Sequence, residues 1–80
     1  METRVGVVAI IVENTQSVAT VNSILHDYSD YIIGRMGIPY RQRNMNVISI
    51  VVDAPHDVIS AMSGNIGRVP GISVKAVYSK

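Results

Sequence analysis

Two segments of this 80-residue chain are apolar at odd and even positions alike, and this pattern constrains the fold more than any other feature. The first such run extends from Val5 to Val12, and the second extends from Val47 to Val52. A strand that is apolar on both faces is covered on both sides, so it belongs in the middle of a sheet. We therefore expect residues 4–13 and 46–53 to form two central strands.

Two further segments, residues 32–39 and 72–78, have the composition of edge strands. In residues 32–39, Arg35 and Gly37 interrupt one face, whereas the other face is apolar and consists of Ile32, Met36 and Ile38. In residues 72–78 the apolar face alternates with a face that carries Ser73 and Lys75. Alternation of this kind is typical of a strand with only one covered face.

Apolar residues at steps of three and four predict two amphipathic helices. The first is about 16 residues long and begins after Asn14 or Thr15, either of which is a suitable N-cap. The second begins at Pro55 and ends at Gly67, which suits the left-handed residue past a helix end. The element order is β-α-β-β-α-β, a weak internal duplication of strand, helix and strand.

This order predicts one α+β domain over residues 1–80, a ferredoxin-like sandwich with antiparallel sheet order 4-1-3-2 and two helices on one face. The helices leave the other apolar face of the sheet uncovered. Hydrophobic residues make up 48% of the chain, charged residues only 16%, and no cysteine can form a stabilising disulfide. Because so small a core is marginal, we expect a homo-oligomer, either a dimer or a tetramer of dimers.

Several chemistries are disfavoured by composition. The lack of cysteine excludes thiolate metal ligands and thiol nucleophiles, and His26 and His56 fall on different predicted helices, so we expect no metal and no cofactor. No serine lies in a nucleophile elbow, so we expect no enzyme. A net charge of +1 disfavours direct nucleic-acid binding, and the apolar runs are too short for a membrane span, which together predict a cytoplasmic protein.

Two segments carry groups suited to a small anionic ligand. One is the loop Glu13, Asn14 and Thr15, where helix-terminal amides follow a buried strand; simple N-capping is the alternative. The other combines glycines, which admit a close backbone approach, with arginines, which bind carboxylates or phosphates. Its residues are Gly34, Arg35, Met36, Gly37, Tyr40 and Arg41. The alternative is a solvated hairpin whose arginines protect an edge strand from aggregation.

Residues 34–41, 47–53 and 61–75 together resemble the iron-only hydrogenase system regulators, and the resemblance spans nearly the whole chain. It implies an ACT-like fold, similar to the C-terminal domain of the nickel-responsive regulator, and a link to hydrogenase maturation or expression. That regulator's nickel ligands of several histidines and a cysteine have no counterpart here, nor does its DNA-binding segment. Any transcriptional effect would therefore need a partner protein.

ACT-like domains typically take small effectors at subunit interfaces, near the first strand-to-helix loop. The resemblance thus implies a regulatory module that binds a small-molecule effector or a protein partner at Glu13–Thr15, with residues 35–41 contributed by a neighbouring subunit. The alternative is a structural or assembly protein that docks through its sheet face without a ligand. Fold analogy by itself does not decide between them.

Overall fold

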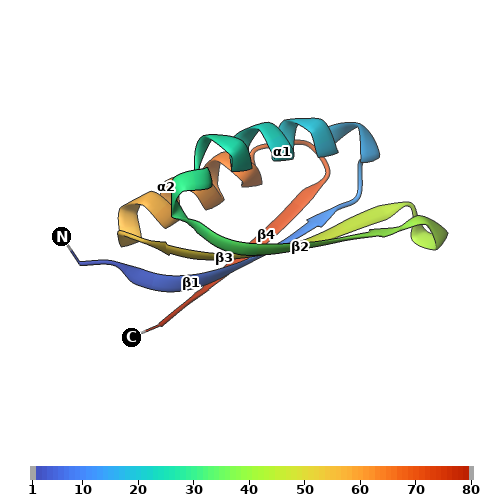
Figure 1. Cartoon of the computed structure of the whole chain (residues 1–80). Helices are drawn as coiled ribbons and strands as arrows, with labels where there is room; N and C mark the ends of the chain where they lie inside the picture. The colour runs from blue at the N-terminus through green and yellow to red at the C-terminus, as the bar shows by residue number, and fades with distance from the viewer. Residues whose placement is uncertain (1, 80) are drawn as a thin grey trace.

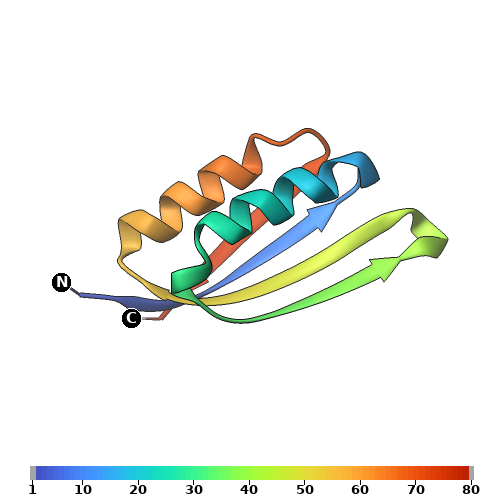
Figure 2. The same ribbon diagram turned by 45° about the horizontal axis from the view of Figure 1, so that its top comes forward.

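The computed structural model describes residues 2–79, and its four strands form a single antiparallel sheet. The strands are β1 (Arg4–Val12), β2 (Ile32–Tyr40), β3 (Met45–Ala54) and β4 (Ile72–Tyr78), and the helices are α1 (Val18–Asp27) and α2 (His56–Gly67). Their spatial order, β2-β3-β1-β4, confirms the predicted 4-1-3-2 sheet. Figure 1 shows this sheet nearly edge-on, with α1 and α2 above it. Both helices lie on the same side of the sheet (Figure 2). None of the helices in this part of the chain is long and apolar enough to cross a bilayer.

The two central strands alternate strictly between the helix-covered face and the opposite face. Val8 of β1 is paired with Ile50 of β3, and both side chains are fully buried beneath the helices. Val7 is paired with Val51 on the other face, where Val7 remains 41% exposed. The prediction that β1 and β3 are central and apolar on both faces is therefore confirmed.

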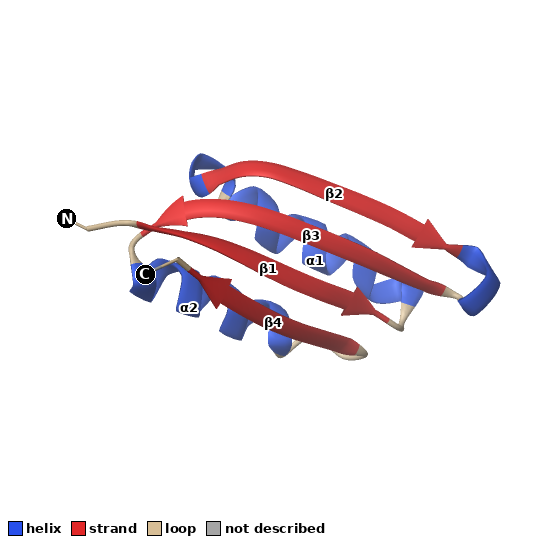
Figure 3. Cartoon of the chain, turned by 90° about the horizontal axis from the view of Figure 1, so that it is seen from below, coloured by secondary structure: helices blue, strands red, loops and turns tan. Residues whose placement is uncertain are grey.

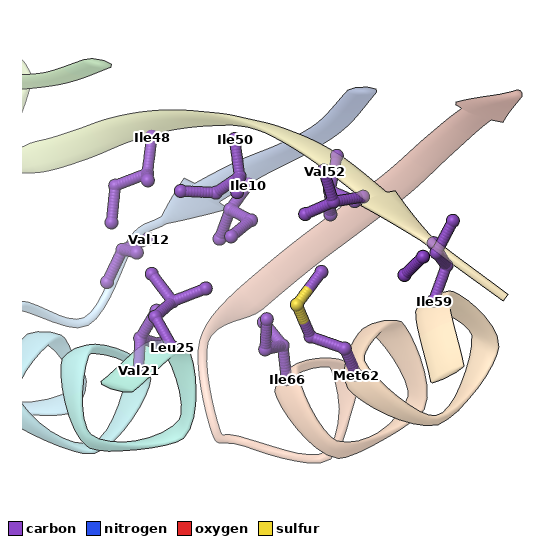
Figure 4. Close-up of a cluster of buried hydrophobic side chains, with 12 residues drawn as sticks. Ile10, Val12, Val21, Leu25, Ile48, Ile50, Val52, Ile59, Met62 and Ile66 are labelled. Atoms are coloured by element: carbon purple, nitrogen blue, oxygen red, sulfur yellow. The ribbon is translucent and has the colours of Figure 1, made fainter. Parts of the chain in front are cut away.

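The core lies between this sheet and the two helices. Figure 4 shows side chains of β1 and β3 pointing towards α1 and α2, and Met62 of α2 lying below Val52. The buried hydrophobic residues are Val8, Ile10, Val12, Val21, Leu25, Ile48, Ile50, Val52, Ala54, Ile59, Met62 and Ile66. Burying each of the larger of these side chains stabilises the fold by about 1.5–3 kcal/mol.

The first helix is shorter than the sequence predicted. The regular helix α1 has 10 residues and is flanked by two single 3₁₀ turns, η1 (Thr15–Ser17) and η2 (Ser29–Tyr31). Ser and Asp in the second of these turns favour local bonding of the backbone over continuation of a helix. The predicted stripe therefore breaks before Ile32, which already belongs to β2.

A β-bulge reverses the predicted orientation of β2. Ile32 is paired with Val52 and Gly34 with Val51, so Ile33 is an extra residue without a partner on β3. A bulge of this kind shifts the alternation of every following side chain. Arg35 is consequently paired with Ile50 on the helix-covered face, while Met36 is paired with Ser49 on the opposite face. The expectation that Ile32 and Met36 share one face was wrong.

The left-handed glycine is Gly71 and not Gly67. Gly67 is the last residue of α2, whereas Gly71 has φ of 75° in the turn before β4. A Cβ on Gly71 would lie 2.6 Å from the Asn14 Cβ, so both the backbone conformation and the close approach require glycine. This contact fixes the turn before β4 against the loop after β1.

Candidate functional site

The side of the sheet turned away from both helices, here called the open face, carries most of the exposed large hydrophobic side chains of residues 2–79. Figure 3 shows the four strands from this side, with the helices behind them. Strand pairing assigns the following residues to it: Val5, Val7, Ala9, Ile11, Gly34, Met36, Ile38, Tyr40, Met45, Val47, Ser49, Val51, Asp53, Ser73, Lys75 and Val77. Eleven of these sixteen are hydrophobic residues, which makes the open face a candidate binding surface.

Exposure is concentrated on this surface. Among residues 2–79, eight large hydrophobic side chains are exposed, and six of them belong to the open face. These six are Val5, Val7, Met36, Ile38, Tyr40 and Val77. Met36 is 58% exposed and Val77 is 69% exposed, values far above those of the core. The bulge at Ile33 contributes directly, because it turns Met36 and Ile38 to this side.

The loop after β1 is held by backbone contacts with the turn before β4. The Glu13 amide donates to the Gly71 carbonyl at 2.8 Å, and the buried Ser17 hydroxyl donates to the Pro70 carbonyl at 2.8 Å. The Asn14 Oδ1 accepts a hydrogen bond from the Gln16 backbone amide at 3.0 Å, so the Asn14 side chain caps η1. Simple N-capping, the alternative to a ligand site in this loop, is therefore present.

The second predicted segment is divided between the two faces of β2. The Arg35 Nη2 donates to the Asn22 Oδ1 of α1 at 2.9 Å, on the helix-covered side. Met36 and Tyr40 lie on the open face. Added Cβ atoms on Gly34 and Gly37 would meet no atom within 4 Å, so neither glycine is required by close packing. Arg41 begins the 3₁₀ turn η3 (Arg41–Arg43) at the tip of the β2–β3 hairpin.

Within one chain, the two predicted segments do not converge as a single pocket. Val12, next to the loop, is paired with Asn46, and Asn46 is paired with Pro39, so the loop and the end of β2 share one end of the sheet two strands apart. Two strand spacings amount to about 10 Å. Arg35 lies farther from the loop, because Arg35 is paired with Ile50, and Ile50 is paired with Val8 near the middle of β1. No pocket is present in the described part of the chain.

Imidazole and carboxylate groups are dispersed. Residues 2–79 contain no cluster of three or more side chains able to ligate a metal ion. His56 instead packs against the ring of Tyr78, with ring centroids 4.8 Å apart.

Two hydrogen bonds between side chains of distant elements were missed from the sequence. Asn22 binds Arg35, as described, and the Asn65 side-chain amide donates to the Tyr28 hydroxyl at 3.1 Å, joining α2 to the end of α1. The hydroxyl of Ser63 is buried without a hydrogen-bond partner among residues 2–79. Helical periodicity could have placed Tyr28 and Asn65 at facing positions, but no local motif marks either contact.

Comparison with known proteins identifies one family. The family described as "TM1266-like: Iron-only hydrogenase system regulator, putative" matches residues 4–76. The structure of uncharacterized protein TM1266 from Thermotoga maritima is 36% identical to this chain, with a TM-score of 0.94, over 99% of this chain and 100% of that chain. No curated protein shows significant similarity to this chain.

Two more distant structures share the fold alone. A formyltetrahydrofolate deformylase from Pseudomonas putida KT2440 is 11% identical, with a TM-score of 0.66, over 91% of this chain and 28% of that chain. An unknown protein from Galdieria sulphuraria is 13% identical, with a TM-score of 0.66, over 99% of this chain and 46% of that chain. The chain thus spans less than half of each of these two proteins.

Proposed function

The chain belongs to the TM1266-like family of iron-only hydrogenase system regulators, and we propose that it acts as a non-enzymatic, ACT-like regulatory module. In this proposal, copies of the chain associate through the open face, and a small-molecule effector binds at the boundary between subunits. A partner protein carries the signal to transcription or maturation of the hydrogenase system.

The observation that carries the proposal is the apolar open face. Four strands spaced by about 4.8 Å, with about nine residues each at about 3.4 Å, cover a flat area of about 600 Å². A stable interface buries about 800 Å² of accessible surface on each partner, which is the same order of size. Six exposed large hydrophobic residues on this area supply the apolar contacts that such an interface uses.

The ACT-like assignment is supported by the β-α-β-β-α-β order together with the β2-β3-β1-β4 sheet. For the effector we propose the end of the sheet where the loop Glu13–Thr15 and the hairpin residues Tyr40 and Arg41 lie. The Arg41 guanidinium suits a carboxylate or phosphate. A neighbouring subunit would complete the binding site that one chain forms only in part. Glu13 and Thr15 are exposed and accessible to such a ligand.

A thermal-shift screen of amino acids, nucleotides and divalent metals tests the proposal. A ligand that binds only the folded protein raises the melting temperature in a concentration-dependent way, by linkage. A flat response to every class, together with an intact oligomer, would instead favour the assembly protein that docks through its open face without a ligand.

A further inference from the structure

Two charged side chains interrupt the open face, and they lie on opposite sides of Val7. On β3, Asp53 is paired with Val5, two residues before Val7. On β4, Lys75 is paired with Ala9, two residues after Val7. The strands β3 and β4 flank β1, so each charge lies one strand away from Val7, in opposite directions. No other Asp, Glu, Lys or Arg occupies an open-face position in the paired strands of residues 2–79.

The two charges are placed symmetrically. A strand spacing of about 4.8 Å and a rise of about 3.4 Å per residue put the Cα of Asp53 and of Lys75 each about 8 Å from that of Val7, at opposite ends of one diagonal. A rotation of 180° exchanges the two ends of this diagonal if its axis lies in the plane of the open face and passes through Val7 at right angles to the diagonal. In two copies related by this rotation, each charge of one copy lies opposite a charge of the other sign on the second copy.

We propose that two copies of this chain pack open face to open face about this axis, so that Asp53 of each copy pairs with Lys75 of the other. This arrangement rests on the self-association proposed above and specifies its register. A two-fold interface is self-complementary by definition, and it contains each contact twice. The two ion pairs lie at the ends of the diagonal, and the apolar contacts lie between them.

The same axis also brings exposed apolar residues of the two open faces together. With these spacings the axis passes over Val7. It also passes over Met36, because Met36 is paired with Ser49 on β3, and Ser49 is paired with Ala9 on β1. Val7 and Met36 therefore each lie opposite the same residue of the second copy. Val5 falls opposite Val77 of the second copy, and both are exposed in the single chain, by 44% and 69%. The strands of the two sheets cross at about 70°, in the orthogonal class of sheet packing.

The charge pattern favours a second copy of the chain over an unrelated partner. One acidic and one basic residue, placed at equal distances on opposite sides of Val7, are complementary to the same two residues on a second copy of this surface. Their immediate paired neighbours, Val5 and Ala9, are apolar, so neither charge is compensated by the residue beside it on the open face. Charge pairs across an interface fix its register and exclude alternatives more than they add affinity.

Charge reversal tests the register. In Asp53→Lys a dimer would oppose two lysines at both ends of the diagonal, and in Lys75→Asp it would oppose two aspartates. We expect each variant alone to dimerise at least about tenfold more weakly than the unmodified chain. An equimolar mixture of the two variants restores both pairs in the heterodimer, so we expect the dimer to return. Sedimentation velocity over a concentration series measures all three.

The matched controls are Asp27→Lys on α1 and Arg68→Asp after α2, which reverse exposed charges away from the open face and should leave dimerisation unchanged. Circular dichroism establishes that each variant is folded. If the unmodified chain dimerises and both charge reversals dimerise equally well, the register is wrong, although association through the open face stands. If the unmodified chain is a monomer, the self-association on which the register rests fails as well.

Discussion

The Arg35 guanidinium donates a hydrogen bond to the Asn22 side chain at 2.9 Å, and this bond places Arg35 on the helix-covered side of β2. The position follows from the bulge at Ile33, which reverses the alternation expected from the sequence. As a consequence, a charged residue is removed from the open face, and Met36 and Ile38 are added to it. The bulge therefore determines how apolar the open face is.

Deleting Ile33 removes the extra residue and makes β2 regular between Ile32 and Gly34. Strict alternation then keeps Ile32 and Arg35 on the helix-covered face and Gly34 on the open face, where the bulged strand already places them. We therefore expect the free energy of unfolding to change by less than about 1 kcal/mol, measured by urea denaturation. Ile33→Ala is the control, because it keeps the bulge and truncates a side chain that is 62% exposed, and it should change stability by less than about 0.5 kcal/mol. A loss above about 3 kcal/mol on deletion alone would contradict this, because it would mean that the deletion moves side chains of β2 between faces.

The sequence predicted the fold more completely than the site. The apolar residues on both faces of β1 and β3 indicated that these two are the central strands, and the sheet order followed from this. The phase of β2 was predicted wrongly because a bulge leaves no signature in a strand whose two faces both contain apolar residues. The candidate residues at Glu13–Thr15 and on β2 were grouped by chemistry alone, and the distance between them depends on β3, which separates their strands.

Gly71→Ala should destabilise the turn before β4. The residue has φ of 75°, and the new Cβ would lie 2.6 Å from the Asn14 Cβ. We expect a loss of about 1–3 kcal/mol in the free energy of unfolding. Gly64→Ala, within α2, meets no atom within 4 Å and should instead stabilise by about 0.5–1 kcal/mol, since alanine favours the helix. A neutral Gly71→Ala would show that the turn can relax away from Asn14.

Arg41 and Arg35 should differ in their effect on an anionic effector. Arg41 lies at the free hairpin tip, whereas Arg35 is bound to Asn22. For any anionic ligand that raises the melting temperature, we expect Arg41→Ala to weaken binding by about tenfold or more, the value of a charge-assisted hydrogen bond. Arg35→Ala should leave affinity unchanged and lower stability by about 0.5–1.5 kcal/mol. The reverse pattern, measured by isothermal titration calorimetry and urea denaturation, would move the effector site to the helix-covered side.

The claim on which the rest depends is that the open face is covered by another copy of the chain. Sedimentation velocity of the unmodified protein, from low to high micromolar concentration, measures this directly alongside Val7→Asp, which introduces an unpaired charge at the centre of the open face. We predict a species of at least twice the mass of the 8.7 kDa chain, and its dissociation in folded Val7→Asp. A single 8.7 kDa species for both proteins across the whole range would contradict the account.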